Sequence, residues 1–228
     1  MKTTDIQSIE KIFRAHSNSA SAEKMAAYMK NKFPFLGISS PERAEIYKII
    51  FDQFGAPSLT EFEAIVNLFW KMPEREFHYF AMHIIEKHKR KLAPSHLEFI
   101  LDLIVKNSWW DSIDWLAPHF VGKILKDFPE LREEYVPQWI ASDNIWINRT
   151  AILFQLKYKK DTDFNLLIEI IESLKHHKEF FVKKAIGWVL REYSKTNPEA
   201  VLQYIEQAQL QALSEKEGLK HIQKQLNK

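Results

Sequence analysis

The chain has 228 residues, of which 46% are hydrophobic and 27% charged, a composition typical of one large globular domain or two small ones. Five glycines are too few for the tight turns of an all-β protein, and the absence of cysteine excludes disulfides, thiolate zinc sites, iron–sulfur clusters and cysteine nucleophiles. The 32 basic and 30 acidic residues leave a net charge of +2, so attraction to a polyanion would require an uneven distribution of charge.

Hydrophobic residues recur at spacings of three and four along nearly the whole chain, which predicts an all-α fold. Proline followed by glutamate favours the first turn of a helix, and this pair occurs at Pro41, Pro73, Pro129 and Pro198. The connections are short, which predicts antiparallel helical hairpins. We expect helices near residues 3–17, 21–32, 41–54, 58–71, 74–91, 94–106, 108–127, 130–141, 144–160, 162–175, 178–196, 198–208 and 214–226.

The helices repeat with a period that corresponds to one helical hairpin. Pro73, Ser108, Asp143 and Lys178 stand 35 residues apart, and each precedes a long expected helix. Superposing these helices aligns mainly apolar residues at the positions expected to be buried. The pattern predicts an α-solenoid in which residues 1–228 form a single domain and the second helix of each hairpin lines one concave side.

One face of the repeated helices combines aromatic with ionisable residues, which is unusual for a buried contact between repeats. We interpret this face as the lining of a groove, and the alternative is a partly solvated face with incidental aromatic residues. Its positions are Arg75, Tyr79 and His83; Trp110, Asp114 and Pro118; Ile145, Arg149 and Leu153; and Phe180, Lys184 and Trp188.

Positive charge is concentrated in the C-terminal half of this face. Four basic residues and no acid lie between residues 147 and 160, and six basic residues oppose two acids between residues 175 and 195. A basic strip on a nearly neutral protein is typical of a surface that binds a phosphate backbone. A solvated helix face is the alternative, and we prefer it for Lys159 and Lys160. Expected helix starts at 39–40 and 142–144 offer backbone N–H groups to phosphate, although helix capping explains these polar residues equally well.

The segment from Asn107 to Trp115 holds three tryptophans and two aspartates. Trp110 and Asp114 are one helical turn apart, so an indole and a carboxylate share the groove face. This pairing suits recognition of a cation, with the carboxylate opposing positive charge that develops during a reaction. Asp114 could equally form a salt bridge with Arg149 in the next repeat, because both residues occupy the same position of the period.

Other catalytic signatures are absent from the sequence. It contains no phosphate-binding loop, dinucleotide-binding glycine motif, zinc protease motif or nucleophile elbow. His83 and His88 are five residues apart and therefore not on one helix face. We expect neither a metal site nor a cofactor.

The groove face and the tryptophan-rich segment together resemble the AlkD-type DNA alkylation repair glycosylases, which are built from HEAT-like repeats. The similarity covers almost the whole chain and is strongest over residues 108–114, 139–159 and 178–198. It implies hydrolysis of the N-glycosidic bond of cationic alkylpurines, such as N3-methyladenine and N7-methylguanine, in duplex DNA. The expected product is an abasic site.

The resemblance also implies roles for individual residues. The catalytic aspartate of the family falls on Asp114, its two sugar-facing tryptophans on Trp110 and Trp188, and its phosphate-contacting arginine on Arg149. Together with the basic strip, it leads us to expect DNA contacts at Tyr28, Ser39, Ser40, Arg43, Lys157, Phe180, Phe181, Lys184 and Arg191.

These observations predict a monomeric, monofunctional DNA glycosylase whose partner is double-stranded alkylated DNA. We expect it in the cytoplasm at the nucleoid, without a membrane partner. The alternative from a different class is a non-catalytic HEAT-repeat module that binds DNA or scaffolds proteins.

Overall fold

The computed structural model describes residues 1–227 and confirms the prediction of an all-α protein, because the described residues contain helices and no strands. The chain divides into two compact units, Met1–Lys91 and Leu92–Lys228. No helix within the described residues is long and apolar enough to cross a membrane.

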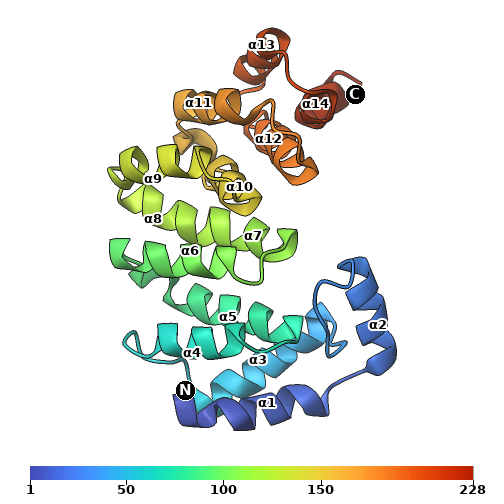
Figure 1. Ribbon diagram of the computed structural model, residues 1–228, viewed down its shortest axis with the longest axis vertical. Coiled ribbons are helices and arrows are strands. Elements are labelled where there is room, and N and C mark those ends of the chain that lie inside the picture. The colour runs from blue at the N-terminus through green and yellow to red at the C-terminus, as the bar shows by residue number, and fades with distance from the viewer. Residues whose placement is uncertain (228) are drawn as a thin grey trace. The chain divides into compact units, whose positions relative to one another are not determined.

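The N-terminal unit contains five α-helices in the described chain (Figure 1). Its core is aromatic, with the ring of Phe13 lying 5.0 Å from that of Phe77 and 5.4 Å from that of Phe80. All three side chains are fully buried, so contacts between α1 and α5 stabilise the unit. The helices are α1 (Ile6–Ala15), α2 (Ser19–Tyr28), α3 (Ser40–Phe54), α4 (Phe62–Trp70) and α5 (Arg75–His88).

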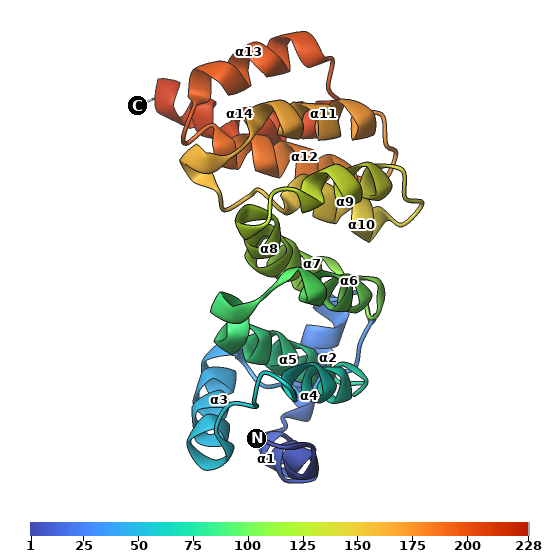
Figure 2. The ribbon, with the colours of Figure 1, turned by 90° about the vertical axis from the view of Figure 1, so that its left-hand side faces the viewer.

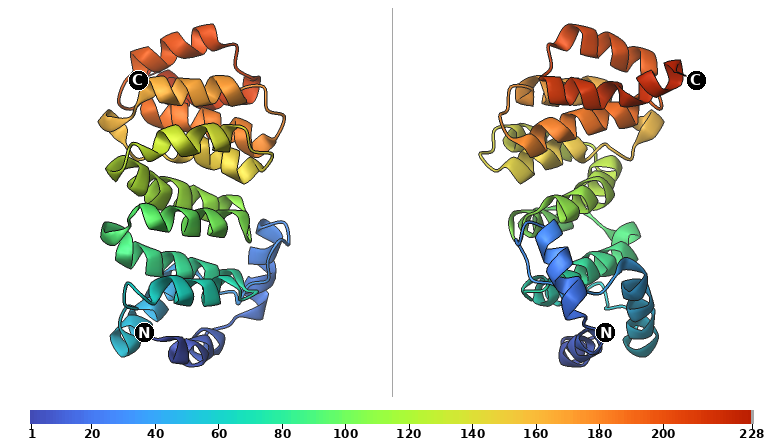
Figure 3. Two further views of the ribbon diagram at one scale, coloured as in Figure 1. Left: turned by 60° about the vertical axis from the view of Figure 1, so that its left-hand side comes forward. Right: turned by 90° about the vertical axis from the view of Figure 1, so that its right-hand side faces the viewer.

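The C-terminal unit is a succession of helical hairpins, which Figure 3 shows from two sides in colours from green to red. Helices α10 and α12 lie side by side in one layer, and α9 and α11 lie in the other (Figure 1). Helices α13 and α14 follow, and α14 packs against α12 (Figure 2). The helices are α6 (Leu97–Val105), α7 (Trp110–Leu116), α8 (Gly122–Asp127), α9 (Leu131–Ile140), α10 (Ile145–Leu153), α11 (Phe164–Leu174), α12 (Phe180–Tyr193), α13 (Pro198–Ala208) and α14 (Ala212–Leu226).

A narrow apolar stripe holds the outer helix α11 in place. In α11 the buried residues Leu167, Ile170, Ile171 and Leu174 follow the spacing i, i+3, i+4, i+7. Each such side chain contributes about 1.5–3 kcal/mol when it leaves water. A helix of 11 residues is marginal in isolation, so this packing, and not helix propensity, keeps α11 folded.

The predicted period is confirmed by the first residues of four helices. Helices α5, α7, α10 and α12 begin at Arg75, Trp110, Ile145 and Phe180, which are 35 residues apart. The aligned positions Ala81, Leu116, Ala151 and Ile186 are completely buried, as the pattern predicted. The period also aligns Ile84, His119, Phe154 and Val189, which are buried except for the half-buried His119.

Two predicted helix ends were wrong, each for a local reason. The expected helix over residues 21–32 ends at Tyr28, because Lys30 and Asn31 adopt left-handed backbone angles. The expected helix over residues 144–160 ends at Leu153. Beyond it, the Gln155 side chain both donates to and accepts from the backbone of Asp163, which closes a turn.

The expected continuous helix over residues 108–127 contains a wider turn. Residues Ala117–Val121 form a π-helix between α7 and α8. Pro118 lies inside this turn and has no N–H to donate to the carbonyl of Asp114, four residues earlier. The helix therefore widens from Ala117, less than one turn after Asp114.

Candidate active site

Asp114 and Arg149 form a bidentate ion pair. Arg149 Nε donates to Asp114 Oδ1 at 2.7 Å, and Arg149 Nη2 donates to Asp114 Oδ2 at 2.9 Å. Asp114 projects from α7 and Arg149 from α10, so the pair joins two successive repeats of the C-terminal unit. The salt bridge that the sequence offered as one of two interpretations is present, and the carboxylate keeps a partly exposed position.

The two partners differ in exposure. The Arg149 side chain is 3% exposed, whereas that of Asp114 is 20% exposed. Arg149 Nη1 also donates to the backbone oxygen of Phe181 in α12. A guanidinium has five N–H bonds, so these three contacts leave two for another acceptor. The buried guanidinium therefore holds the Asp114 carboxylate in place, and part of the carboxylate remains accessible to solvent.

Burial raises the pKa of Asp114 above the ordinary value of 3.8. Hydrogen bonds and positive charge from Arg149 act in the opposite direction but do not cancel the effect of burial. The nearby charge of Asp111 adds to the rise. Asp114 is therefore a carboxylate whose charge is poorly solvated by water and is balanced mainly by one guanidinium.

An aromatic cluster contacts this pair through Phe181, whose backbone oxygen accepts from Arg149. The rings of Trp109, Trp146 and Phe181 lie 5.0–5.7 Å apart, and the ring of Phe180 lies 5.5 Å from that of Phe181. Because Phe181 also accepts the hydrogen bond from Arg149, the cluster and the ion pair form one packed group. The sequence interpretation placed Phe180 and Phe181 near DNA but did not identify Trp146.

The two predicted sugar-facing tryptophans occupy defined positions on helices of this unit. Trp110 begins α7 one turn before Asp114, and Trp188 lies in α12 one turn after Lys184. Both indoles are half-buried.

The predicted groove face is only partly exposed, which corrects the sequence interpretation. Arg75, Arg149, Pro118 and Leu153 are buried, although the pattern placed all four in the lining. In the N-terminal unit, the guanidinium of Arg75 lies 3.9 Å from the ring of Phe33, which explains how a charge is accommodated there. The alternation of aromatic and ionisable residues therefore does not show whether a position is exposed or is buried against a partner.

The predicted basic contacts in the C-terminal unit differ in their surroundings. Lys157 is exposed just after α10, at residues that form a turn. Lys184 and Arg191 of α12 both contact Glu217 of α14, at 2.7 Å and 3.1 Å. Glu217 was absent from the sequence interpretation, because α14 lies outside the repeated segments and no spacing relates it to α12.

Three of the four predicted contacts of the N-terminal unit border a cavity of about 310 Å³, namely Tyr28, Ser40 and Arg43. Arg43 donates to the backbone oxygen of Ile38 and to Ser40 Oγ, both at 2.8 Å, and its guanidinium lies 4.6 Å from the ring of Tyr79. Tyr28 is 69% exposed at the edge of this cavity.

Ser39 serves as the N-cap of α3. Its side chain accepts from the backbone of Glu42, and Glu42 accepts from the backbone N–H of Ser39 at 2.8 Å. Asn144 caps α10 in the same manner, by accepting from the backbone of Trp146. Helix capping therefore accounts for both of these polar residues.

A family model described as DNA alkylation repair enzyme matches residues 9–222. The chain belongs to this family. Its structure is similar to that of a predicted DNA alkylation repair enzyme from Enterococcus faecalis, with a TM-score of 0.83 and 30% sequence identity over 90% of this chain and 96% of that one. The protein smu.31 from Streptococcus mutans shares the fold at a TM-score of 0.60, with 18% identity over 88% of this chain and 98% of that one. No curated protein matches the sequence.

In this member of the DNA alkylation repair family, Asp114 and Arg149 form a bidentate contact at the centre of the candidate site. No group of three or more histidine, cysteine, aspartate or glutamate side chains within residues 1–227 is arranged to hold a metal ion. The carboxylate, its arginine partner and the neighbouring aromatic rings are the chemical groups that the candidate site presents.

Proposed function

We propose that the protein is a monofunctional DNA glycosylase that hydrolyses the N-glycosidic bond of cationic alkylpurines in duplex DNA. N3-methyladenine and N7-methylguanine are the substrates expected from this chemistry, and the product is an abasic site. The observation that carries the proposal is the partly exposed Asp114 carboxylate, held by two hydrogen bonds from a buried arginine. Membership of a DNA alkylation repair family supports the same substrate class.

The reaction places its main demand on charge stabilisation. An alkylpurine already carries positive charge and departs as a neutral base, so the leaving group needs no protonation. The deoxyribose becomes cationic as the bond breaks, and a carboxylate about 4 Å away stabilises a unit positive charge by roughly 4 kcal/mol at an effective dielectric constant near 20. This energy corresponds to about a thousandfold in rate. Asp114 supplies that charge and accepts a proton from the attacking water.

Arg149 holds the carboxylate in one orientation and favours its ionised form. Because Arg149 is also bonded to the backbone of Phe181, the guanidinium cannot follow a moving carboxylate. Trp110 and Trp188 would contact the deoxyribose, where their π faces favour developing positive charge. Lys157, Lys184 and Arg191 in one unit, and Tyr28, Ser39, Ser40 and Arg43 in the other, would contact the DNA backbone.

The proposal is tested by incubating the purified protein with duplex DNA that has been treated with a methylating agent. Chromatography should detect free N7-methylguanine and N3-methyladenine, and alkali should then cleave the strand at the abasic sites. A protein that binds this duplex and releases neither base would instead be a non-catalytic DNA-binding module.

A further inference from the structure

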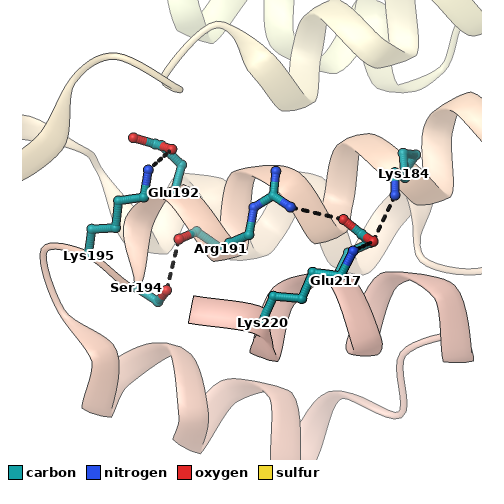
Figure 4. A network of polar contacts seen from close by, with 7 residues as sticks. All are labelled: Lys184, Arg191, Glu192, Ser194, Lys195, Glu217 and Lys220. Carbon is teal, nitrogen blue, oxygen red and sulfur yellow. Dashed lines mark hydrogen bonds and ion pairs between the residues drawn. The ribbon is translucent and has the colours of Figure 1, made fainter. Parts of the chain in front are cut away.

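Glu217 lies at the centre of a cluster of three positive side chains (Figure 4). Its Oε1 is 2.7 Å from Lys184 Nζ and also pairs with Lys220, while its Oε2 accepts from Arg191 Nη1 at 3.1 Å. The side chain of Glu217 is 5% exposed, whereas those of the three cations are 37%, 32% and 45% exposed. The carboxylate is therefore covered by its partners, and the partners remain accessible to a ligand.

The carboxylate is charged throughout the physiological range. Burial acts to raise the pKa of Glu217, but the hydrogen bonds and charges of Lys184 and Lys220 outweigh it and bring the pKa to about 2. One negative charge among three positive ones leaves the cluster with a surplus of positive charge. Such a surplus, spread over donors that keep unused N–H bonds, suits a phosphodiester.

Close contact between α12 and α14 brings Glu217 to this position. A side chain at Gly187 would put its Cβ only 2.4 Å from Glu217 Cβ and 2.7 Å from the backbone oxygen of Ser214. Glycine at position 187 therefore allows α14 to approach α12 closely enough for one carboxylate to reach cations on both helices. Ser214 Oγ adds a hydrogen bond at 2.9 Å to the backbone oxygen of Lys183 in α12.

The cluster is adjacent to one of the residues proposed to contact the sugar. Lys184, Trp188 and Arg191 follow the spacing i, i+4, i+7 on α12 and therefore share one helix face. Glu217 contacts the first and the third of these residues. It thus fixes the two cations on either side of Trp188.

We propose that Glu217 is a positioning residue for DNA binding, which holds Lys184 and Arg191 so that they contact phosphates flanking the nucleotide at Trp188, with Lys220 extending the contact onto α14. The inference rests on the proposed function. An ordered cation loses less conformational freedom on binding than a mobile one, so a negative residue can increase affinity for a polyanion. If only net charge mattered, neutralising Glu217 would increase the affinity for DNA, because every acidic residue near DNA repels the phosphates.

Glu217→Gln tests the proposal, because positioning predicts weaker DNA binding by the variant and net charge alone predicts tighter binding. Affinity for undamaged duplex DNA is measured over a range of salt concentrations for the wild type and the variant. We expect the variant to bind roughly threefold to tenfold more weakly and its salt slope to fall by about one to two units, because ordered phosphate contacts are lost. Unchanged or tighter binding would overturn the proposal.

Two controls separate positioning from charge and from folding. Glu215→Gln makes the same charge change at an exposed residue of the same helix, and binding should be unchanged or slightly tighter. Glu217→Asp keeps the charge but shortens the side chain, so it should weaken binding if it is positioning that matters. This variant also decides the question if Glu217→Gln does not fold, since wild-type affinity in Glu217→Asp would contradict a positioning role.

A double-mutant cycle shows whether Glu217 acts through its partners. In a Lys184→Ala, Arg191→Ala background, Glu217→Gln should have little further effect on affinity. An undiminished effect would contradict the proposal. Assays of the wild type distinguish this inference from the proposed function. A wild type that binds no DNA would overturn both proposals. A wild type that binds DNA and releases methylated bases would support the proposed function, whatever the result for the Glu217 variants.

Discussion

Arg149 donates two parallel hydrogen bonds to the carboxylate of Asp114, and the two residues are 35 positions apart in the chain. The arginine is buried and the aspartate is partly exposed. Breaking a buried pair leaves an uncompensated charge, which costs more than the net contribution of the intact pair. The same contact therefore serves both the stability of the C-terminal unit and the proposed chemistry.

Arg149→Lys should separate these two contributions. Lysine keeps the positive charge but cannot make two parallel bonds and also reach the backbone of Phe181. We expect the free energy of unfolding to fall by about 1–3 kcal/mol and base release to slow roughly tenfold or more. Arg14→Lys is the matched control, because the exposed Arg14 pairs with Glu10 and Glu74, and it should change stability by less than about 1 kcal/mol. Wild-type base release in Arg149→Lys would show that the bidentate contact is dispensable.

The pH dependence of base release should reflect the raised pKa of Asp114. The proposed mechanism needs the ionised carboxylate, so activity should fall with decreasing pH at a value above the ordinary 3.8. Because Arg149 lowers this pKa, Arg149→Lys should move the acid limb to higher pH. Single-turnover rates, corrected for uncatalysed depurination at each pH, provide the measurement. An acid limb that does not move in the variant would contradict the assignment of the limb to Asp114.

Lys184 should not form a covalent intermediate with the sugar. A lysine that attacks a sugar carbon needs a nitrogen that is free to approach it, whereas Lys184 Nζ is held in an ion pair 2.7 Å from Glu217 Oε1. We therefore expect no trapped protein–DNA adduct when borohydride is added during the reaction on methylated duplex. An adduct that forms with the wild type and disappears in Lys184→Ala would show a covalent mechanism.

Glu217 should make stability depend on pH in a defined window. Its pKa is lowered from 4.5 to about 2 in the folded state, so its stabilising effect is present above pH 4.5 and is lost as the pH falls towards 2. The shift corresponds to about 3 kcal/mol at most, and solvent screening at the partly exposed cations reduces it to about 1–2 kcal/mol. Urea unfolding of the wild type and of Glu217→Gln should differ near neutral pH and converge in acid. A constant difference at all pH values would mean that Glu217 does not titrate in this range.

The repeat was predictable from sequence because its signals are local. Pro73, Ser108 and Asp143 mark the starts of three of the four long helices, and apolar spacing marks the buried face of each. The sequence alone therefore predicts the period of 35 residues. The contact between Asp114 and Arg149 follows from the same period. The sequence could not decide whether these residues pair with each other or face a ligand, because one repeat position serves either purpose.

The features that could not be predicted from the sequence depend on contacts between helices that the 35-residue repeat does not relate to one another. Glu217 belongs to α14, which is outside the repeats, and its neighbours in sequence do not suggest a buried carboxylate. Arg75 and Leu153 occupy the same repeat face as Asp114, yet packing around each position leaves them buried. Trp146 joins the aromatic cluster through the positions of Trp109 and Phe181, which lie in other helices or at their ends.

The most direct test compares base release by the wild type and by Asp114→Asn. The amide keeps the shape of the carboxylate but not its charge, so single-turnover release of N7-methylguanine from methylated duplex should slow roughly a hundredfold or more. The affinity for undamaged duplex should change little, and Asp102→Asn, at an exposed pair with Lys106, should behave as the wild type does. Equal rates for the wild type and a folded Asp114→Asn variant would contradict the assignment of Asp114 as the catalytic carboxylate.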